Sequence, residues 1–329
     1  MSPASEKRVL SIQSHVVVGH VGNRAASVPL IFLNYEVDIL NTVQFSNHTG
    51  YGRWAGRKMD RDELVDIFNA MDQNGLLRQS HLLTGYVPSP ESLEAVSTMV
   101  DRLRTLNPNL VYILDPVLGD SDKLYVHPKC VDVYKTILPK ATCATPNHFE
   151  AQLLTDVRIT SLAHLKQALN TFHDRYNIPH IVISSTPSSQ IEGLEPGYLV
   201  CAGSSRPAGS SISQQFTITF PALPEHYEGV GDVFSSLILA HFARPSNTQE
   251  PCPLSHTAER AIATLAGILA KTRKHALELA KDEVDITGSN PAETPEERIK
   301  RLALVELRLV QSYKEITEPV IIHRAVPLV

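Results

Sequence analysis

The chain has 329 residues and lacks the features of membrane, secreted and nucleic-acid-binding proteins. None of its apolar runs approaches the roughly 18 residues that a membrane-spanning helix needs. The N-terminus is polar, so no secretory signal is expected. The formal net charge of -5 argues against a dedicated nucleic-acid binder, because such proteins are usually basic. We therefore expect a cytoplasmic protein with neither a membrane nor a nucleic acid as partner.

Cysteine is also scarce. The four cysteines, Cys130, Cys143, Cys201 and Cys252, lie far apart, so neither a disulfide framework nor a structural zinc site is expected. The sequence contains no GxxxxGK[ST], GxGxxG, HExxH or GxSxG motif. These absences disfavour a P-loop nucleotide site, a dinucleotide-binding loop, a zinc protease and a serine hydrolase.

The 43% of hydrophobic residues suffices for a large core, and their spacing indicates the fold class. Short runs rich in Val, Ile and Leu predict buried strands over residues 8–12, 37–43, 81–84, 110–114 and 180–184. Helical patterns lie between them, over residues 60–71, 91–106 and 161–172. Alternating strands and helices predict an α/β fold with a parallel sheet covered on both faces. Such sheets bind ligands outside the carboxyl ends of their strands.

The C-terminal part of the chain has a different pattern. Residues 184–215 are rich in Ser, Gly and Pro and predict loops with one or two short strands, such as one over 198–201. Three helices are expected over 232–243, 257–280 and 295–312, with a surface loop over 282–292. No repeat or linker divides the chain, so we expect one domain over residues 1–329.

Six polar segments follow predicted strands or short apolar stretches, and the strongest signal is Gly-Val-Gly-Asp at residues 229–232. Its two glycines can turn several backbone N–H groups toward one anion at the start of a helix. Asp232 could then orient a hydroxyl and accept its proton during phosphoryl transfer. By itself, the segment also fits a glycine turn with an aspartate N-cap.

The other five segments are ambiguous when each is taken alone. Asp115 and Asp120, in the sequence DPVLGD, suit a hard cation such as Mg²⁺ but also fit turn chemistry. Asn147 and Glu150, in TPNHFE, either share a helix face or form a capping box. The remaining segments place hydroxyls or amides after strands and are also compatible with ordinary loops; they cover 11–23, 43–51 and 83–86.

Together and in this order, the six segments resemble the pyridoxal kinases of the ribokinase-like superfamily. The motifs SIQSHVVVGHVGN and FSNHTGY are specific to pyridoxal kinases, whereas DPV, TPN and GVGD are shared across the superfamily. The similarity extends from about Arg8 to Pro319. Because six motifs rarely occur in one order by chance, the resemblance outweighs the turn and loop interpretations. It implies a ribokinase-like three-layer α/β/α sandwich with a mostly parallel central sheet.

The resemblance implies transfer of the ATP γ-phosphate to the 5′-hydroxyl of pyridoxal, pyridoxine and pyridoxamine. Asp232 would be the general base, and the backbone N–H groups of Gly229, Val230 and Gly231 would stabilise the transferring phosphoryl. Ser14 and Thr49 would bind the polar substituents of the pyridine ring. The residues implied to form the ring pocket and the flap over it are Val21, Val43, Phe45, Tyr86 and Tyr125.

For the co-substrate ATP, the resemblance implies contacts at Asp115, Asn147, Glu150, Ser184, Ser185, Phe220, Leu223, Val230 and Gly231. Mg²⁺ or another divalent cation and a monovalent cation, K⁺ or Na⁺, are the implied cofactors. The residues implied to hold them, directly or through water, are Asp115, Asp120, Thr145 and Glu150. With Asp232, this set places four carboxylates near a polyphosphate, which is repulsive unless cations bridge them. Members of the family are usually homodimers, so a homodimer is expected.

Two departures from the family pattern affect the ATP site. Val230 stands where the family often has Thr, which removes a hydroxyl but keeps a backbone N–H. The loop between Asp120 and Tyr125 is shorter than in many members. Two other functions stay open, namely a kinase for a related alcohol such as hydroxymethylpyrimidine and a non-catalytic protein that binds B6 vitamers.

Overall fold

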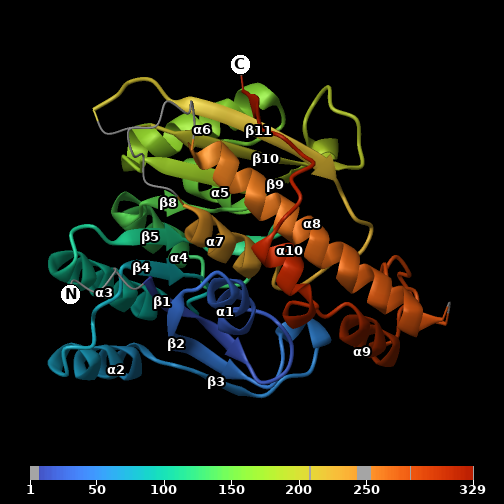
Figure 1. Cartoon of the computed structure of the whole chain (residues 1–329), viewed down its shortest axis with the longest axis horizontal. Helices are drawn as coiled ribbons and strands as arrows, with labels where there is room; N and C mark the ends of the chain where they lie inside the picture. Colours follow the sequence, from blue (N-terminus) through green and yellow to red (C-terminus); the bar gives the residue numbers. More distant parts are fainter. Residues whose placement is uncertain (1–6, 207–208, 243–252, 282, 329) are drawn as a thin grey trace.

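The computed structural model describes residues 7–206, 209–242, 253–281 and 283–328. Within these residues the central sheet has ten strands (Figure 1). In spatial order they are β12 (Val326–Pro327), β11 (Gln214–Pro221), β10 (Tyr198–Ser205), β9 (His180–Pro187), β8 (Cys143–Ala144), β5 (Val111–Leu114), β4 (His81–Thr84), β1 (Arg8–Val16), β2 (Glu36–Phe45) and β3 (Gly56–Lys58).

The central strands of this sheet, from β9 to β2, pair in parallel, and the strands outside them pair antiparallel. The prediction of a mostly parallel sheet is therefore confirmed. A separate hairpin of β6 (Gly119–Asp120) and β7 (Lys123–Leu124) follows β5. Its turn residues, Ser121 and Asp122, have positive φ angles of 49° and 60°, as a two-residue type I′ turn requires. This tight turn accounts for the short loop before Tyr125.

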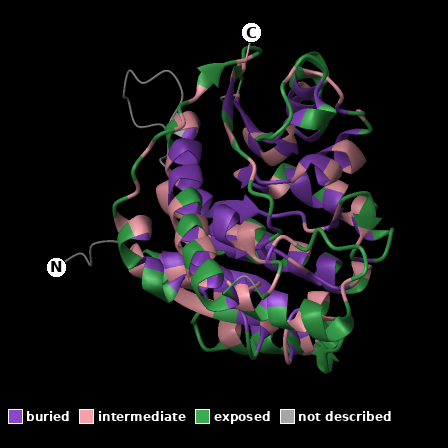
Figure 2. Ribbon diagram, turned by 90° about the vertical axis from the view of Figure 1, so that its right-hand side faces the viewer, coloured by how far each residue is buried: buried purple, intermediate pink, exposed green. Residues whose placement is uncertain are grey.

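Helices cover both faces of the sheet and give the molecule three layers. They are α1 (Asn23–Phe32), α2 (Arg61–Gln73), α3 (Pro90–Leu106), α4 (Cys130–Ile137), α5 (His148–Thr155), α6 (Leu162–Tyr176), α7 (Val230–His241), α8 (Pro253–Ala280), α9 (Pro295–Leu304) and α10 (Tyr313–Thr317). One hydrophobic core packs α2 to α6 on one face, and a second packs α1, α7, α8 and α10 on the other. The central strands and the inward faces of the helices are buried, whereas the edge strands β3 and β12 are exposed (Figure 2).

The strand β5 shows why a continuous apolar run folds as a strand here. Tyr112 and Leu114 belong to the first core, whereas Val111 and Ile113 belong to the second. Successive side chains of a strand point to opposite faces, so a strand covered on both faces needs apolar residues at every position. The α/β/α expectation from the sequence is confirmed.

The Ser-, Gly- and Pro-rich stretch contains more strand than the sequence indicates. It holds the second half of β9, all of β10 and the start of β11, and β11 was not expected. Gly203 in β10 shows the reason, because a Cβ atom there would lie 2.3 Å from the ring of Phe216 in β11. Small residues leave room for the aromatic ring of the next strand, and this packing hides the usual strand signal.

The helix expected over 295–312 is too long, because α9 ends at Leu304. After it, Val305, Leu307 and Leu309 are buried, at 3%, 2% and 0% exposure. This spacing of two does not follow the helical period.

Parts of other expectations lie outside the described residues. The helix expected over 232–243 runs from Val230 to His241, and Ala243 is not described. Cys252, the rest of 244–252 and Asp282 are not described either, while 283–292 lies outside helices and strands. The other three cysteines are buried and free. No helix among the described residues is long and apolar enough to cross a membrane.

Candidate active site

The motif segments meet at one edge of the sheet, beyond the carboxyl ends of the parallel strands. The register pairs Thr84 with Leu114 and Leu114 with Ala144. Asp115 N–H donates to Thr84 O at 2.9 Å, and Thr145 N–H donates to Leu114 O at 3.0 Å. Asp115 and Thr145 therefore follow neighbouring strands at the same height, where open α/β sheets bind ligands.

Gly22 joins the first strand to the Gly-Val-Gly-Asp segment. Its N–H donates a 2.8 Å hydrogen bond to Asp232 Oδ2. Its Cα lies against Ser14, because an added Cβ would be 2.2 Å from Ser14 O and 2.3 Å from Ser14 Oγ. Ser14 and Asp232 are far apart in the sequence but lie on either side of this one glycine.

Gly229 brings the start of α7 against the same loop. It has a φ of +79°, and an added Cβ would be 2.0 Å from the carbonyl oxygen of His20. α7 packs beside α1, which begins at Asn23 directly after that loop (Figure 1). Among the described residues no side chain caps α7. The first N–H groups of α7 are therefore available to an anion.

Asp232 lies in the first turn of α7, and the pKa of its carboxyl is shifted from the ordinary value. Burial raises its pKa to about 6; the Gly22 N–H opposes this shift, and the charge of Glu228 adds to it. A carboxyl with this pKa is mostly ionised at neutral pH and still binds a proton more tightly than an ordinary aspartate. Both properties suit a general base.

Asp115 is buried close to two other acidic side chains of the site, Glu150 and Asp232. It is 6% exposed. Burial raises its pKa well above the usual value, the charges of Glu150 and Asp232 raise it further, and a hydrogen bond with Ser235 opposes the shift. The three carboxyl groups therefore repel one another when all are ionised.

Glu150 and Asn147 form a capping box at the start of α5, and they also hold the loop after β5. Asn147 Oδ1 accepts from Glu150 N–H, and Glu150 Oε2 accepts from Asn147 N–H, both at 2.9 Å. Glu150 Oε1 accepts from Leu118 N–H at 2.8 Å, and Asn147 Nδ2 donates to Gly119 O at 2.8 Å. Burial raises the pKa of Glu150 to about 7 despite these N–H donors. The structural and functional interpretations of this segment are thus compatible.

The site fits cations that share their coordination with phosphate. Thr145 Oγ1 is buried without a hydrogen-bond partner in the described structure, and the buried carboxyl of Asp115 is exposed to the negative charges of Glu150 and Asp232. In the described ranges no group of three or more His, Cys, Asp or Glu side chains could hold a metal ion by itself. Mg²⁺ usually takes only one or two protein carboxylates and completes its shell with water and phosphate oxygens. Asp120 accepts from Ser121 N–H at 2.7 Å and lies on the nearby hairpin.

The apolar residues implied for the pyridine ring come together. Val43 and Phe45 form a small cluster with Val16, and Val21 and Tyr86 pack against it. Val16, Val43 and Phe45 belong to neither of the two main cores, whereas Tyr86 also packs against the first of them. Thr49 lies near it in a short 3-10 helix, η1 (Thr49–Tyr51).

Two residues near this apolar cluster, Trp54 and Gly22, were not identified as site residues from the sequence. Trp54 is 46% exposed, and its ring lies 4.3 Å from that of Phe45, measured between centroids. It is the only tryptophan of the chain and follows the FSNHTGY motif, which was the available signal. Gly22 was part of a recognised motif, but its contact with Asp232 joins two distant segments.

The remaining expected residues lie at the same edge of the sheet or on the hairpin. Tyr125 is 54% exposed, and burial together with the charges of Asp120, Glu228 and Glu150 raises its pKa to about 12. Ser184 and Ser185 lie in β9. The antiparallel register carries Phe220, at the end of β11, to this edge, and Leu223 follows it.

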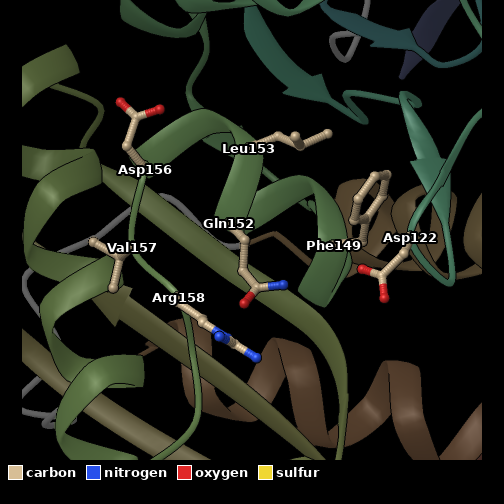
Figure 3. Close-up of a pocket in the computed structure, with 7 residues that line it drawn as sticks. All are labelled: Asp122, Phe149, Gln152, Leu153, Asp156, Val157 and Arg158. Atoms are coloured by element: carbon tan, nitrogen blue, oxygen red, sulfur yellow. The ribbon is translucent and has the colours of Figure 1, made fainter.

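A cavity of about 430 Å³ lies along the outer side of α5 (Figure 3). Its lining residues are Asp122, Phe149, Gln152, Leu153, Asp156, Val157 and Arg158. None of the expected site residues lines it. The convergence of Ser14, Gly22 and Asp232 is therefore the better guide to the chemistry, since a site is recognised by its convergent polar groups.

Replacing Asp115 with asparagine is expected to stabilise the fold while impairing activity. A carboxyl whose pKa is raised in the folded state contributes stability below its unfolded pKa, and this contribution is lost as pH rises through the folded value. At pH 7 that contribution is reduced, because the unfolded carboxyl ionises freely while burial and neighbouring charge oppose ionisation in the folded protein. Removing this buried carboxyl should raise the free energy of unfolding by about 1–3 kcal/mol. Urea unfolding in a tetramethylammonium buffer without nucleotide or metal would measure it.

The matched control is Asp66→Asn on the exposed side of α2, which should leave stability unchanged. The gain from Asp115→Asn should shrink toward pH 4, where the wild-type carboxyl is protonated. An Asp115→Asn protein less stable than wild type at pH 7 would contradict the electrostatic argument.

Comparisons with known proteins agree with this geometry. A family model described as phosphomethylpyrimidine kinase matches residues 79–264. The pyridoxal kinases of Arabidopsis thaliana and Homo sapiens are each 35% identical to the chain, over 96% and 98% of it and 93% and 99% of their own lengths. A Leishmania donovani pyridoxal kinase in complex with ADP and pyridoxamine has a TM-score of 0.81 at 30% identity, covering 98% of this chain and 99% of that one. The chain therefore belongs to the pyridoxal kinase family, with a ribokinase-like fold.

Proposed function

We propose that this protein transfers the γ-phosphate of ATP to the 5′-hydroxyl of pyridoxal, pyridoxine and pyridoxamine. The observation that carries the proposal is Gly22, which hydrogen-bonds Asp232 on one side and lies against Ser14 on the other. It joins a segment specific to pyridoxal kinases to the phosphate-binding segment of the wider superfamily. Because one site needs both ends of the chain, we also propose a single domain, so neither half should be active alone.

In this mechanism Asp232 accepts the proton of the vitamer hydroxyl as that oxygen attacks the γ-phosphorus. The N–H groups of Gly229, Val230 and Gly231, with the positive end of α7, stabilise the negative charge of the transferring phosphoryl. Val230 supplies only its backbone here. Ser14 and Thr49 orient the ring, and the cluster around Val43 holds its apolar face; its other proposed members are Phe45, Val21 and Tyr86.

The proposed cofactors are a divalent cation such as Mg²⁺ and a monovalent cation, K⁺ or Na⁺. When bound, they neutralise negative charge on the phosphates. Asp115, Glu150 and Asp120 would hold the divalent ion directly or through water. Thr145, whose buried hydroxyl oxygen is unpartnered in the described structure, would help Asp115 hold the monovalent ion. The proposed ATP contacts also include Asn147, Ser184, Ser185, Phe220 and Leu223, and Tyr125 would close over the site.

The proposal has a direct test in ADP release. Each vitamer is supplied with saturating Mg-ATP and potassium, and turnover is expected with at least one. No turnover with any vitamer would overturn the proposal. Tight vitamer binding without ADP formation would instead indicate a non-catalytic binding protein.

Turnover should depend on pH through Asp232. Because the pKa of Asp232 is raised to about 6, the base of the free protein is protonated below that pH, and kcat/KM should fall there about tenfold per pH unit. Measuring kcat/KM from about pH 5 to pH 8 with each vitamer would show it. The inflection should be shared by all three vitamers, since it belongs to the protein. An inflection that moves with the vitamer would contradict the assignment.

A kinase for a hydroxymethylpyrimidine is the second candidate, because the matching family model is described as phosphomethylpyrimidine kinase. That model covers residues 79–264 and leaves out Ser14, Phe45 and Thr49, which we place around the ring. Competition between pyridoxal and hydroxymethylpyrimidine for the same preparation would decide between the two. Preference for the pyrimidine would replace the vitamer assignment.

We also propose that the protein is a cytoplasmic homodimer. The support is the resemblance to pyridoxal kinases, which are usually homodimers. Light scattering of the full chain would give the mass, for which one chain contributes 36.3 kDa.

A further inference from the structure

Glu306, a carboxylate outside the motif segments, lies where two loops of the proposed vitamer site meet. It follows α9, and its side chain is 21% exposed. The residues on either side of it, Val305 and Leu307, are buried in the second core. This packing fixes the backbone and directs Glu306 away from the core.

Two loops donate to this carboxylate. Glu306 Oε2 accepts from His20 N–H at 3.0 Å. Glu306 Oε1 accepts from the Tyr51 hydroxyl at 3.2 Å and lies 3.4 Å from His48 Nε2. Gly19 packs on the same oxygen, because an added Cβ would be 2.6 Å from it. The loop before α1 and the loop after β2 are thus held by one side chain.

The contacts keep Glu306 ionised. Burial alone would raise its pKa, but hydrogen bonds and charge from His48, the His20 N–H and the Tyr51 hydroxyl together lower it below the usual value. Hydrogen bonds to a charged group are stronger than neutral ones. The carboxylate therefore contributes more to loop geometry than a neutral side chain of the same shape.

His48 extends this cluster to the phosphate-binding segment. It is 7% exposed, and a Cβ added to Gly50 would be 2.8 Å from His48 Nδ1 and 3.0 Å from Glu228 Oε1. His48, Glu228 and Glu306 line one small cavity of about 10 Å³ with Leu302 and Val305. Glu228 directly precedes Gly229, so the cluster connects both vitamer loops with the start of the Gly-Val-Gly-Asp segment.

We infer that Glu306 is a positioning residue for vitamer binding. It touches no reacting atom and acts through His20 and Tyr51. The first of these loops continues into Val21 and Gly22, and the second contains Thr49, so both carry proposed vitamer contacts. The inference rests on the proposed function, since it concerns the same site.

The test compares the KM for the vitamer with the KM for ATP in Glu306→Ala and Glu306→Gln. Glu306→Ala should raise the vitamer KM by about 10-fold or more, as expected when hydrogen bonds to a charge are lost. Glu306→Gln should have a smaller effect, because its amide oxygen can still accept one hydrogen bond. The KM for ATP should change by less than about twofold in both variants. Calorimetric titration with pyridoxal in the absence of ATP should show the same weakening.

The matched control is Glu315→Gln. Glu315 is a carboxylate of the same C-terminal region, its side chain is 27% exposed, and it pairs with Lys271 at 2.7 Å, away from both loops. Its replacement should leave both KM values unchanged. If Glu306→Ala does not fold, Tyr51→Phe removes one donor to Glu306 and should raise the vitamer KM as well.

The outcomes separate the inference from the proposed function. An inactive wild-type protein would overturn the function. An active wild type whose vitamer KM is unchanged in Glu306→Ala, or in Tyr51→Phe if Glu306→Ala does not fold, would overturn the positioning role alone. Equal changes in both KM values would show a general structural role and would overturn it too.

Discussion

Replacing Asp232 with asparagine is expected to lower turnover by about 10²–10⁴-fold, the usual contribution of a general base. The amide oxygen can still accept the Gly22 N–H, which donates to Asp232 Oδ2 at 2.8 Å, so the loop should keep its shape. The amide cannot accept the proton of the vitamer hydroxyl. ADP release at saturating vitamer would give kcat, and titration with ADP would show whether nucleotide binding is retained.

The control for this variant is Asp132→Asn. Asp132 is likewise an acidic residue in the first turn of a helix, α4, but it is exposed and lies outside the site. Its replacement should leave kcat unchanged. Unchanged turnover in Asp232→Asn would remove Asp232 as the base, and loss of ADP binding would mean that the substitution disturbs the phosphate site instead.

The apolar cluster that we propose to hold the pyridine ring was predictable because its residues follow local patterns. Val43 and Phe45 lie at the end of a strand with a clear apolar run, and Tyr86 follows another. Parallel strands bring their carboxyl ends to one edge, so the order of the strands suffices to gather these residues. The cluster of Val21, Val43, Phe45 and Tyr86 is therefore a consequence of motif and strand order together.

Glu306 was not predictable, because its partners are distant and its local pattern is misleading. The apolar residues over 295–312 have helical spacing and predict one helix that contains Glu306. In such a helix the backbone of Glu306 would differ from the non-helical path that the structure has directly after Leu304. The structure ends α9 at Leu304 and joins Glu306 to His20 across 286 residues. The spacing of apolar residues within one segment gives no information about a contact between two segments so far apart.

Asn147 and Glu150 show a different limit. The sequence offered a shared helix face and a capping box as alternatives, and the structure contains the capping box. The same side chains also hold Leu118 and Gly119 of the loop that follows Asp115. Sequence spacing could not show this second use, because it depends on which loop lies opposite α5.

Replacing Gly22 with alanine is expected to impair both stability and activity. Gly22 has a φ of +54°, and a Cβ atom would lie 2.2 Å from the backbone oxygen of Ser14, which cannot rotate away. With φ 54° and ψ −134° the backbone lies outside the left-handed helical region and is open essentially to glycine alone, so it costs alanine about 1–3 kcal/mol, and relieving the overlap costs about 1–3 kcal/mol more. Displacing the Gly22 N–H also moves Asp232, and a shift of about 1 Å in a reacting group can lower kcat/KM about 10²-fold.

Gly75→Ala separates the cost of the backbone conformation from the cost of the steric overlap. Gly75 has a φ of +66° and no atom within 4 Å of an added Cβ, so its substitution carries the cost of a positive φ without the overlap. It should lower the free energy of unfolding by about 1–2 kcal/mol and leave kcat/KM unchanged. If Gly22 acts through Asp232, then Gly22→Ala should lower kcat much less in an Asp232→Asn background than in wild type, because residues that act as a unit are not additive. Equal losses in both backgrounds would instead assign Gly22 to the Ser14 side of the site.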